Sequence, residues 1–274
     1  MILDQQNRWA LEDSFGPKVS GIHDLETVQV HHAALWQLGI PTDVIDMDCP
    51  LEDYSLVIAP MLYMLRPGGA EKLTAFVRRG GTLAGIYQTG LVNENDLCFE
   101  GRVPHRLTEL FGLHREEIHS LWDGQENHMT WQNKDYPLTE LGERVHPTTA
   151  RVLAAYTEDF YAGEPALLVN LYGQGKAYYM AARPGADFLL DFYRLVAPQS
   201  GAAPCIRAEL PSGVTATCRE KVETDYLFLQ NWNDHPVDVP LHESLTDFDS
   251  GADAGSTVSL DRYEVKIFRR RKHG

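Results

Sequence analysis

Clustered cysteines are absent from this sequence of 274 residues. The four cysteines, Cys49, Cys98, Cys205 and Cys218, lie far apart in the chain and form no CxxC pair. A structural zinc site needs clustered ligands and a disulfide framework needs a denser set of cysteines, so the pattern argues against both. We therefore expect reduced, partly buried thiols that behave as small hydrophobic side chains.

Long apolar runs are also absent. No stretch is long enough to span a bilayer. The first residues, MILDQQNRWALED, carry acidic groups and a tryptophan in place of the cationic start of a secretory leader. With 43% hydrophobic residues and ordinary glycine and proline counts, the chain can bury one large core or two smaller ones. These features predict a soluble, cytoplasmic protein that does not associate with membranes.

Positive charge is scarce. The chain holds 24 Lys and Arg against 39 Asp and Glu, a net charge of −15. Residues 1–200 hold 15 basic and 27 acidic side chains, and residues 201–274 hold 9 and 12, so both parts are acidic. Such a surface repels phosphate backbones, which argues against a nucleic-acid partner. The one basic cluster, Arg269 to Lys272, is expected to be a solvated tail.

The first two hundred residues alternate apolar strand patterns with helical periodicity. Apolar spacing predicts a helix over 24–38, ended by Gly39, and a second helix that begins at Pro67 and ends at Gly80-Gly81. Strands are expected at 42–47, 56–59 and 82–87. This alternation favours right-handed βαβ units and therefore an α/β fold with a doubly wound, flavodoxin-like parallel sheet.

The remainder is organised differently. Residues 113–150 show no regular pattern, and three strands and a closing helix follow, at 151–156, 165–172, 176–182 and 187–196. Residues 197–204 have the composition of a linker. Beyond them, short β runs separated by Asn, Asp, Gly and Pro predict a small antiparallel β-sandwich. We therefore expect two domains, 1–200 and 205–274.

Two places carry residue types that could serve catalysis. Gln88 and Thr89 follow the strand at 82–87, where doubly wound enzymes often keep a nucleophile, but neither side chain is reactive without an adjacent base. An ordinary turn is the preferred interpretation. Glu94 and Asp96 stand too close in sequence to face each other across a glycosidic bond. A hydrogen-bonded loop or a contact surface is the better hypothesis there.

Other motifs are equally weak. His31 and His32 are neighbours on a predicted helix and point about 100° apart, so they cannot share a metal ion. His114 and His119 lack a surrounding set of ligands, and the glycine pairs do not match a phosphate-binding loop. Five scattered tryptophans are more typical of core or interface positions than of a sugar platform. From the residues alone we therefore assign no catalytic, cofactor-binding or metal-binding position, and we expect no cofactor.

Several segments together carry a family resemblance. They are the opening DQQNRWALE at 4–12, the strand VIAPMLY at 57–63, RGGT at 79–82, VNENDLCF at 92–99, FG at 111–112 with EEI at 116–118, and the hairpin from Ala166 to Tyr179. In combination they resemble the non-catalytic part of family 42 β-galactosidases, and the last 60 residues are similar to that family's small β domain. The loop 94–99 together with the strand APMLY is the most specific part.

The resemblance implies a function for the region. In that family a (β/α)8 barrel hydrolyses terminal β-galactosides with two glutamates. A second domain with a glutamine-amidotransferase-like fold builds a trimer, and a third is a β-sandwich. This chain resembles the second and third only, so no catalytic glutamate is carried over. The amidotransferase nucleophile and base are also missing, since the corresponding positions hold Gln88 and Arg183.

Three hypotheses follow. In the first, the chain is an oligomerisation and support region of a β-galactosidase that forms a homotrimer and has a catalytic barrel domain as its other partner. Alternatively it is a stand-alone sugar-related binding or assembly protein that works with a separately encoded barrel. The third hypothesis is an independent hydrolase that uses Thr89 or the Glu94/Asp96 loop. On the first hypothesis, the loop 93–99 lies near the trimer contact or near the place that a barrel would occupy. The alternative is that Leu97 and Phe99 fold back into their own domain's core.

Overall fold

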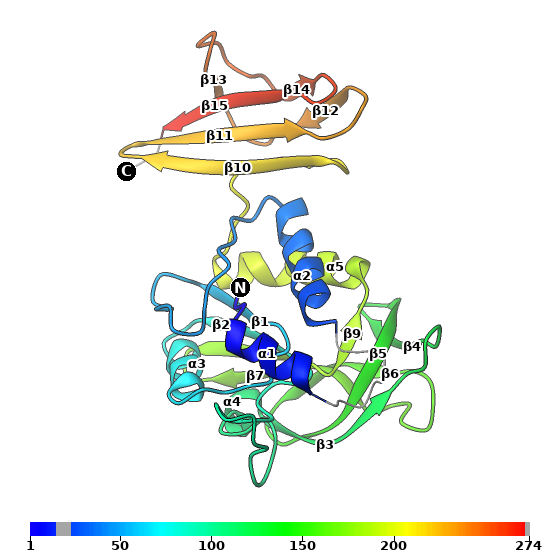
Figure 1. Ribbon diagram of the computed structural model, residues 1–274. Coiled ribbons are helices and arrows are strands. Elements are labelled where there is room, and N and C mark those ends of the chain that lie inside the picture. Colours follow the sequence, from blue (N-terminus) through cyan, green and yellow to red (C-terminus); the bar gives the residue numbers. More distant parts are fainter. Residues whose placement is uncertain (15–22, 272–274) are drawn as a thin grey trace. The chain divides into compact units, whose positions relative to one another are not determined.

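The computed structural model describes residues 1–14 and 23–271, and Figure 1 shows the course of the chain. Internal contacts divide the chain into two units. The first combines Met1–Val30 with Asp43–Asp191, and the second combines His31–Thr42 with Phe192–Gly274. The division passes through two helices, α2 (Asp24–Gln37) and α5 (Ala186–Ser200). The expected helices at 24–38 and 187–196 therefore both form.

A nine-stranded sheet forms the centre of the first unit (Figure 1). Its hydrogen-bonded order is β1-β2-β8-β7-β6-β4-β5-β3, with β9 paired to β5. The bounds are β1 Leu56–Ala59, β2 Thr82–Ile86, β3 Leu113–Ser120, β4 Asn127–Trp131, β5 Lys134–Pro147, β6 Arg151–Tyr156, β7 Pro165–Tyr172, β8 Gly175–Met180 and β9 Ala182–Pro184. The α/β class expected from the sequence is confirmed.

The sheet is mixed, which corrects the expectation of a parallel one. Only the β1–β2 and β2–β8 pairings are parallel, and every other pairing in this sheet is antiparallel. Residues 113–150, which have no regular sequence pattern, supply three of the antiparallel strands. The expected strand at 42–47 does not form, and an isolated β-bridge between Ile45 and Ile2 takes its place. The turn at 173–175 joins β7 and β8 as the predicted hairpin.

Two helices cover one face of the parallel strands. They are α3 (Gly69–Arg78) and α4 (Thr108–Phe111), and α3 turns Leu73, Phe76 and Val77 inward as its spacing predicts. Phe111 of α4 packs so close to β2 that a Cβ on Gly85 would lie 2.4 Å from its ring. Only glycine fits there. The sequence pattern gave no indication of the first helix, α1 (Gln5–Asp13).

The second unit holds two small antiparallel sheets. One has the order β10-β11-β15-β13 and the other pairs β12 with β14. Their bounds are β10 Val214–Lys221, β11 Thr224–Asn231, β12 Val237–Pro240, β13 Thr246–Asp247, β14 Thr257–Leu260 and β15 Val265–Arg271. Inward side chains such as Leu227, Leu229 and Phe268 are flanked along their strands by half-buried residues and form a separate core. The small antiparallel region expected here is confirmed.

Two expectations for this unit need correction. The basic cluster is no tail, since Arg269, Arg270 and Arg271 end strand β15, while Lys272 lies outside the described residues. Arg270 donates to Asp225 at 2.7 Å and to Glu243 at 3.0 Å, so it acts as a partly buried cross-link. The first residues of the expected linker belong to α5, which continues to Ser200.

Candidate functional site

An open groove lies between α1 and the loop that follows Val92. Its volume is about 340 Å³, and its lining comes from Gln6, Trp9, Ala10, Asp13, Met64, Glu94, Asn95 and Asp96. Trp9 is 61% exposed, which is unusual for so large an apolar side chain and makes the ring available to a ligand or partner. All lining residues belong to the first unit.

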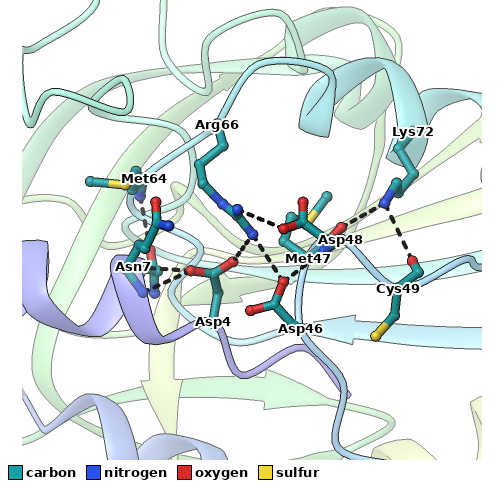
Figure 2. A network of polar contacts seen from close by, with 10 residues as sticks. Asp4, Asn7, Asp46, Met47, Asp48, Cys49, Met64, Arg66 and Lys72 are labelled. Atoms are coloured by element: carbon teal, nitrogen blue, oxygen red, sulfur yellow. Dashed lines mark hydrogen bonds and ion pairs between the residues drawn. The ribbon is translucent and has the colours of Figure 1, made fainter.

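Helix α1 is fixed from its buried side. The Asp4 carboxylate caps the helix by accepting from the backbone N–H groups of Gln6 and Asn7, at 2.9 and 3.1 Å. The Asn7 amide donates to the carbonyl of Met61 at 3.0 Å and accepts from the N–H of Met64 at 2.9 Å, as Figure 2 shows in part. Because these contacts hold the inner face of α1, Trp9 is directed outward.

A partly buried arginine reinforces the helix start (Figure 2). Arg66 donates to Asp4 at 2.5 Å, to Asp46 at 2.9 Å and to Asp48 at 2.8 Å. Burial opposes its charge, but hydrogen bonds to Asp48 and Asp4 outweigh that effect and raise the pKa of Arg66. Lys72 of α3 donates to the carbonyl of Met47 in the same segment, at 2.7 Å. The segment 46–48 and the start of α1 are therefore held together by charge-assisted hydrogen bonds.

The loop on the other side is shaped by one asparagine. Asn93 accepts from the backbone N–H groups of Asn95 and Leu97 at 2.9 and 3.1 Å, and Asp96 adopts a left-handed φ of 58°. Phe99 stacks on His105 with ring centroids 3.8 Å apart, whereas Leu97 is 62% exposed. The alternative that both apolar side chains fold back is thus correct for Phe99 and wrong for Leu97.

The groove combines an apolar floor with an acidic rim. Ala10 and Met64 pack with Val92 in a small apolar cluster beneath it, while Glu94 and Asp96 are exposed at its edge. An apolar surface with charges at its margin is typical of a protein contact. Glu94 and Asp96 are therefore exposed at the edge of the groove, and their role in a contact stays a prediction.

The turn after β2 is a second, closed site. Gln88 adopts a left-handed φ of 65° and is 2% exposed, so the turn is more strained than an ordinary one. The Thr89 hydroxyl is fully buried and donates to the carbonyl of Ile86, the last residue of β2. Sequence reasoning located this turn correctly, but its side chains are turned away from solvent.

A fully buried glutamate closes this turn. One oxygen of Glu143 accepts from the Gln88 backbone N–H at 2.9 Å and from Arg115 at 3.2 Å, and the other accepts from the Tyr179 hydroxyl at 2.7 Å. Burial, followed by the nearby Glu143 charge, raises the pKa of Tyr179 well above its usual value, so the phenol remains a donor. Tyr156 donates to the Glu143 carbonyl at 3.0 Å. Sequence reasoning missed Glu143 because it lies in the segment without a regular pattern.

Arg183 takes part in an ion-pair chain next to this turn. It pairs with Glu140 and, at 3.1 Å, with Glu26, and Glu140 also contacts His23. A guanidinium offers only hydrogen-bond donors and no acceptor, so it cannot act as a general base. The position that was compared with an amidotransferase base therefore holds an arginine that is ion-paired with glutamates.

The histidine candidates are separated by the fold. His31 is buried and lies 2.6 Å from the Tyr193 hydroxyl. His114 lies against His146, while His119 stacks on Tyr161. Within residues 1–14 and 23–271, no three His, Cys, Asp or Glu side chains gather in a geometry that could hold a metal ion.

The four cysteines are free and differ in environment, and the expectation of partly buried thiols is wrong for Cys98. Cys205 is buried, Cys49 and Cys218 are partly buried and Cys98 is exposed. Burial raises the pKa of the Cys205 thiol to about 12. Of the helices in the described part of the chain, none is both long and apolar enough to cross a membrane.

The fold defines an α/β protein followed by a small antiparallel β unit, with an open groove on the first unit. The chain belongs to the β-galactosidase trimerisation domain family of glycoside hydrolase family 42, whose model matches residues 1–201. The model of the β-galactosidase C-terminal domain matches residues 213–270. The resemblance expected from the sequence is confirmed.

Relatives match over nearly the whole chain. The β-galactosidase BglY of Alicyclobacillus acidocaldarius is 44% identical over 98% of this chain, and Pbg of Clostridium perfringens is 38% identical over 99%. The crystal structure of a β-galactosidase from Rahnella sp. R3 superimposes with a TM-score of 0.93 at 40% identity, covering 98% of this chain. The chain spans about 40% of the length of each of these proteins.

Proposed function

We propose that this chain is the oligomerisation and support region of a family 42 β-galactosidase, and that it assembles as a trimer in the cytoplasm. The observation that carries the proposal is the match of residues 1–201 to a domain described by its role in trimerisation. We assign the assembly role to residues 1–200 and a supporting role to the β domain at 205–274.

The geometry of the two sites supports this division of labour. The groove beside Trp9 is open, whereas the turn at Gln88 is buried and its hydrogen-bonding groups are occupied. An amidotransferase-like fold would place a cysteine nucleophile at that turn, and this chain has Gln88. Hydrolysis of β-galactosides then belongs to a catalytic barrel, in the part of the relatives that this chain does not span.

Sedimentation equilibrium of the purified chain tests the proposal. We expect a species of about 92 kDa, three times the 30.8 kDa of one chain, at micromolar concentration. A chromogenic β-galactoside should not be turned over, in contrast to a full-length relative assayed in parallel. A monomer at several hundred micromolar would refute the assembly role, and turnover that persists through purification would refute the division of labour.

A further inference from the structure

Besides the groove with its acidic rim, the first unit has a second exposed apolar surface, and the charges beside it are positive. Leu171 on β7 is 75% exposed, and the register places it opposite Lys176 on β8. Two residues earlier, Val169 lies opposite both Tyr178 and Arg151 of the flanking strands. Paired residues in antiparallel strands point to the same face, and so do residues two apart in a strand. Leu171, Lys176 and Arg151 therefore share one face.

These cations are available for a partner. Among the described residues, no ion pair is found for Arg151 or Lys176, although most arginines of this unit are paired. Arg151 is exposed and Lys176 is partly exposed. We call Leu171, Lys176 and Arg151 the basic patch. It presents one large apolar side chain with positive charge on two sides.

The acidic groove cannot pair with its own copy. A two-fold contact would bring Asp13, Glu94 and Asp96 of one chain against the same carboxylates of the other, and like charges at an interface oppose association. The groove needs a partner surface that is apolar and basic. In a chain whose first 200 residues carry a net charge of −12, such a surface is uncommon.

We propose that the groove of one copy receives the basic patch of a second copy, with Leu171 against Trp9 and with Lys176 and Arg151 facing the carboxylate rim. The inference rests on the proposed assembly function and assigns its contact residues. Because groove and patch are different surfaces of the same unit, the contact is head-to-tail. Repetition of a head-to-tail contact closes a ring when the rotation fits, which is the geometry that a cyclic trimer requires.

The residue types suit this contact. Tryptophan and arginine are the side chains most often found to dominate binding at interfaces, and a cation over an indole face gains further attraction. The carboxylates form the rim, where complementary charge selects the partner and speeds association. Trp9 should therefore matter for affinity, and Asp96 for the choice of surface.

Charge reversal on each side tests the pairing. Asp96→Lys disables the groove, and Lys176→Glu disables the patch. We expect each variant alone to associate at least roughly tenfold more weakly than the parent chain. An equimolar mixture keeps one intact groove and one intact patch, so the two variants should associate with each other more strongly than either does alone, into species of about 62 kDa or more. The double variant Asp96→Lys/Lys176→Glu, which restores opposite charges, should regain the assembly.

Matched controls separate contact from folding. Asp53→Lys makes the same charge change at an exposed site outside the groove, and Trp122→Ala removes an 81% exposed tryptophan to match Trp9→Ala. Both controls should assemble normally, whereas Trp9→Ala should not. Circular dichroism confirms that each variant is folded.

The outcomes distinguish this inference from the proposed function. A parent chain that stays monomeric refutes both. A parent chain that assembles while Asp96→Lys and Lys176→Glu assemble equally well refutes only the groove–patch contact. Failure of the mixture to form any pair, or of the double variant to recover, also overturns the head-to-tail pairing.

Discussion

The two sites of the first unit hold their carboxylates in opposite environments, one buried and one exposed. At the turn after β2, the carboxylate of Glu143 is fully buried and accepts from three donors. At the groove, Glu94 and Asp96 stand in solvent around an exposed Trp9. The buried carboxylate fixes a backbone turn, while the exposed carboxylates are free to meet a partner.

The comparison shows why strand-end position is a weak guide to function. Gln88 occupies the strained place where a doubly wound enzyme presents a nucleophile, and its left-handed backbone is held by Glu143. The cluster makes the turn rigid without leaving a reactive group at the surface. The open surface lies elsewhere, on a helix that the sequence pattern did not predict.

Glu143→Ala should produce the largest effect. It leaves the Arg115 guanidinium, the Tyr179 hydroxyl and the Gln88 N–H without their acceptor in a buried site. Removal of one partner of a buried ion pair costs about 3–5 kcal/mol of unfolding free energy. Urea unfolding followed by circular dichroism measures the loss.

A surface glutamate provides the control for this prediction. Glu94→Ala removes an exposed carboxylate at the groove rim, and its stability should stay within about 0.5 kcal/mol of the parent chain. A loss below about 1 kcal/mol for Glu143→Ala would mean that the buried cluster does not fix the turn.

The sequence predicted those elements whose stabilising contacts are local or periodic. Helix α3 has a regular apolar face, and strands β1 and β2 are continuous apolar runs. The helix and both strands were therefore placed correctly. Strand β5 was missed because its apolar positions do not alternate regularly along its 14 residues and a register shift interrupts its pairing with β9. Helix α1 was missed because a polar residue, Asn7, faces inward.

The sites were predictable to different degrees. The loop at 93–99 was singled out because polar groups stand beside Leu97 and Phe99, and that mixture is visible in the sequence. Glu143 depends on Arg115, Tyr179 and Gln88, which are 28, 36 and 55 residues away in the chain. Such a cluster exists only after the sheet has formed, and no local pattern predicts it.

Asp4→Ala should weaken the groove through its support. Loss of an N-cap typically costs about 1–2 kcal/mol, and Arg66 also loses one of its carboxylates. We expect a smaller loss of stability than for Glu143→Ala and, in addition, weaker self-association because α1 presents Trp9. Urea unfolding and sedimentation measure the two effects.

Asparagine at the same position separates the cap from the charge. Asp4→Asn retains a good capping side chain but removes the negative charge facing Arg66. If the cap is the main contribution, Asp4→Asn should retain most of the stability and association. Equal losses in the two variants would assign the effect to the ion pair.

The smallest expected effect is a pH response at the junction of the groove loop with its own core. Burial, with the Arg106 charge as second cause, lowers the pKa of His105, and Glu71 opposes the shift. The folded state then binds fewer protons than the unfolded state, so stability falls as pH drops from about 6.5 through the lowered pKa. Because His105 stacks on Phe99, amide exchange in 92–99 should accelerate, by less than about tenfold, between pH 7 and pH 5.5 after correction for intrinsic rates. His105→Phe keeps an aromatic stack without a titrating group, so its corrected exchange should not change over this range. An equal acceleration in His105→Phe would assign the response to another group, such as His114, whose pKa burial also lowers.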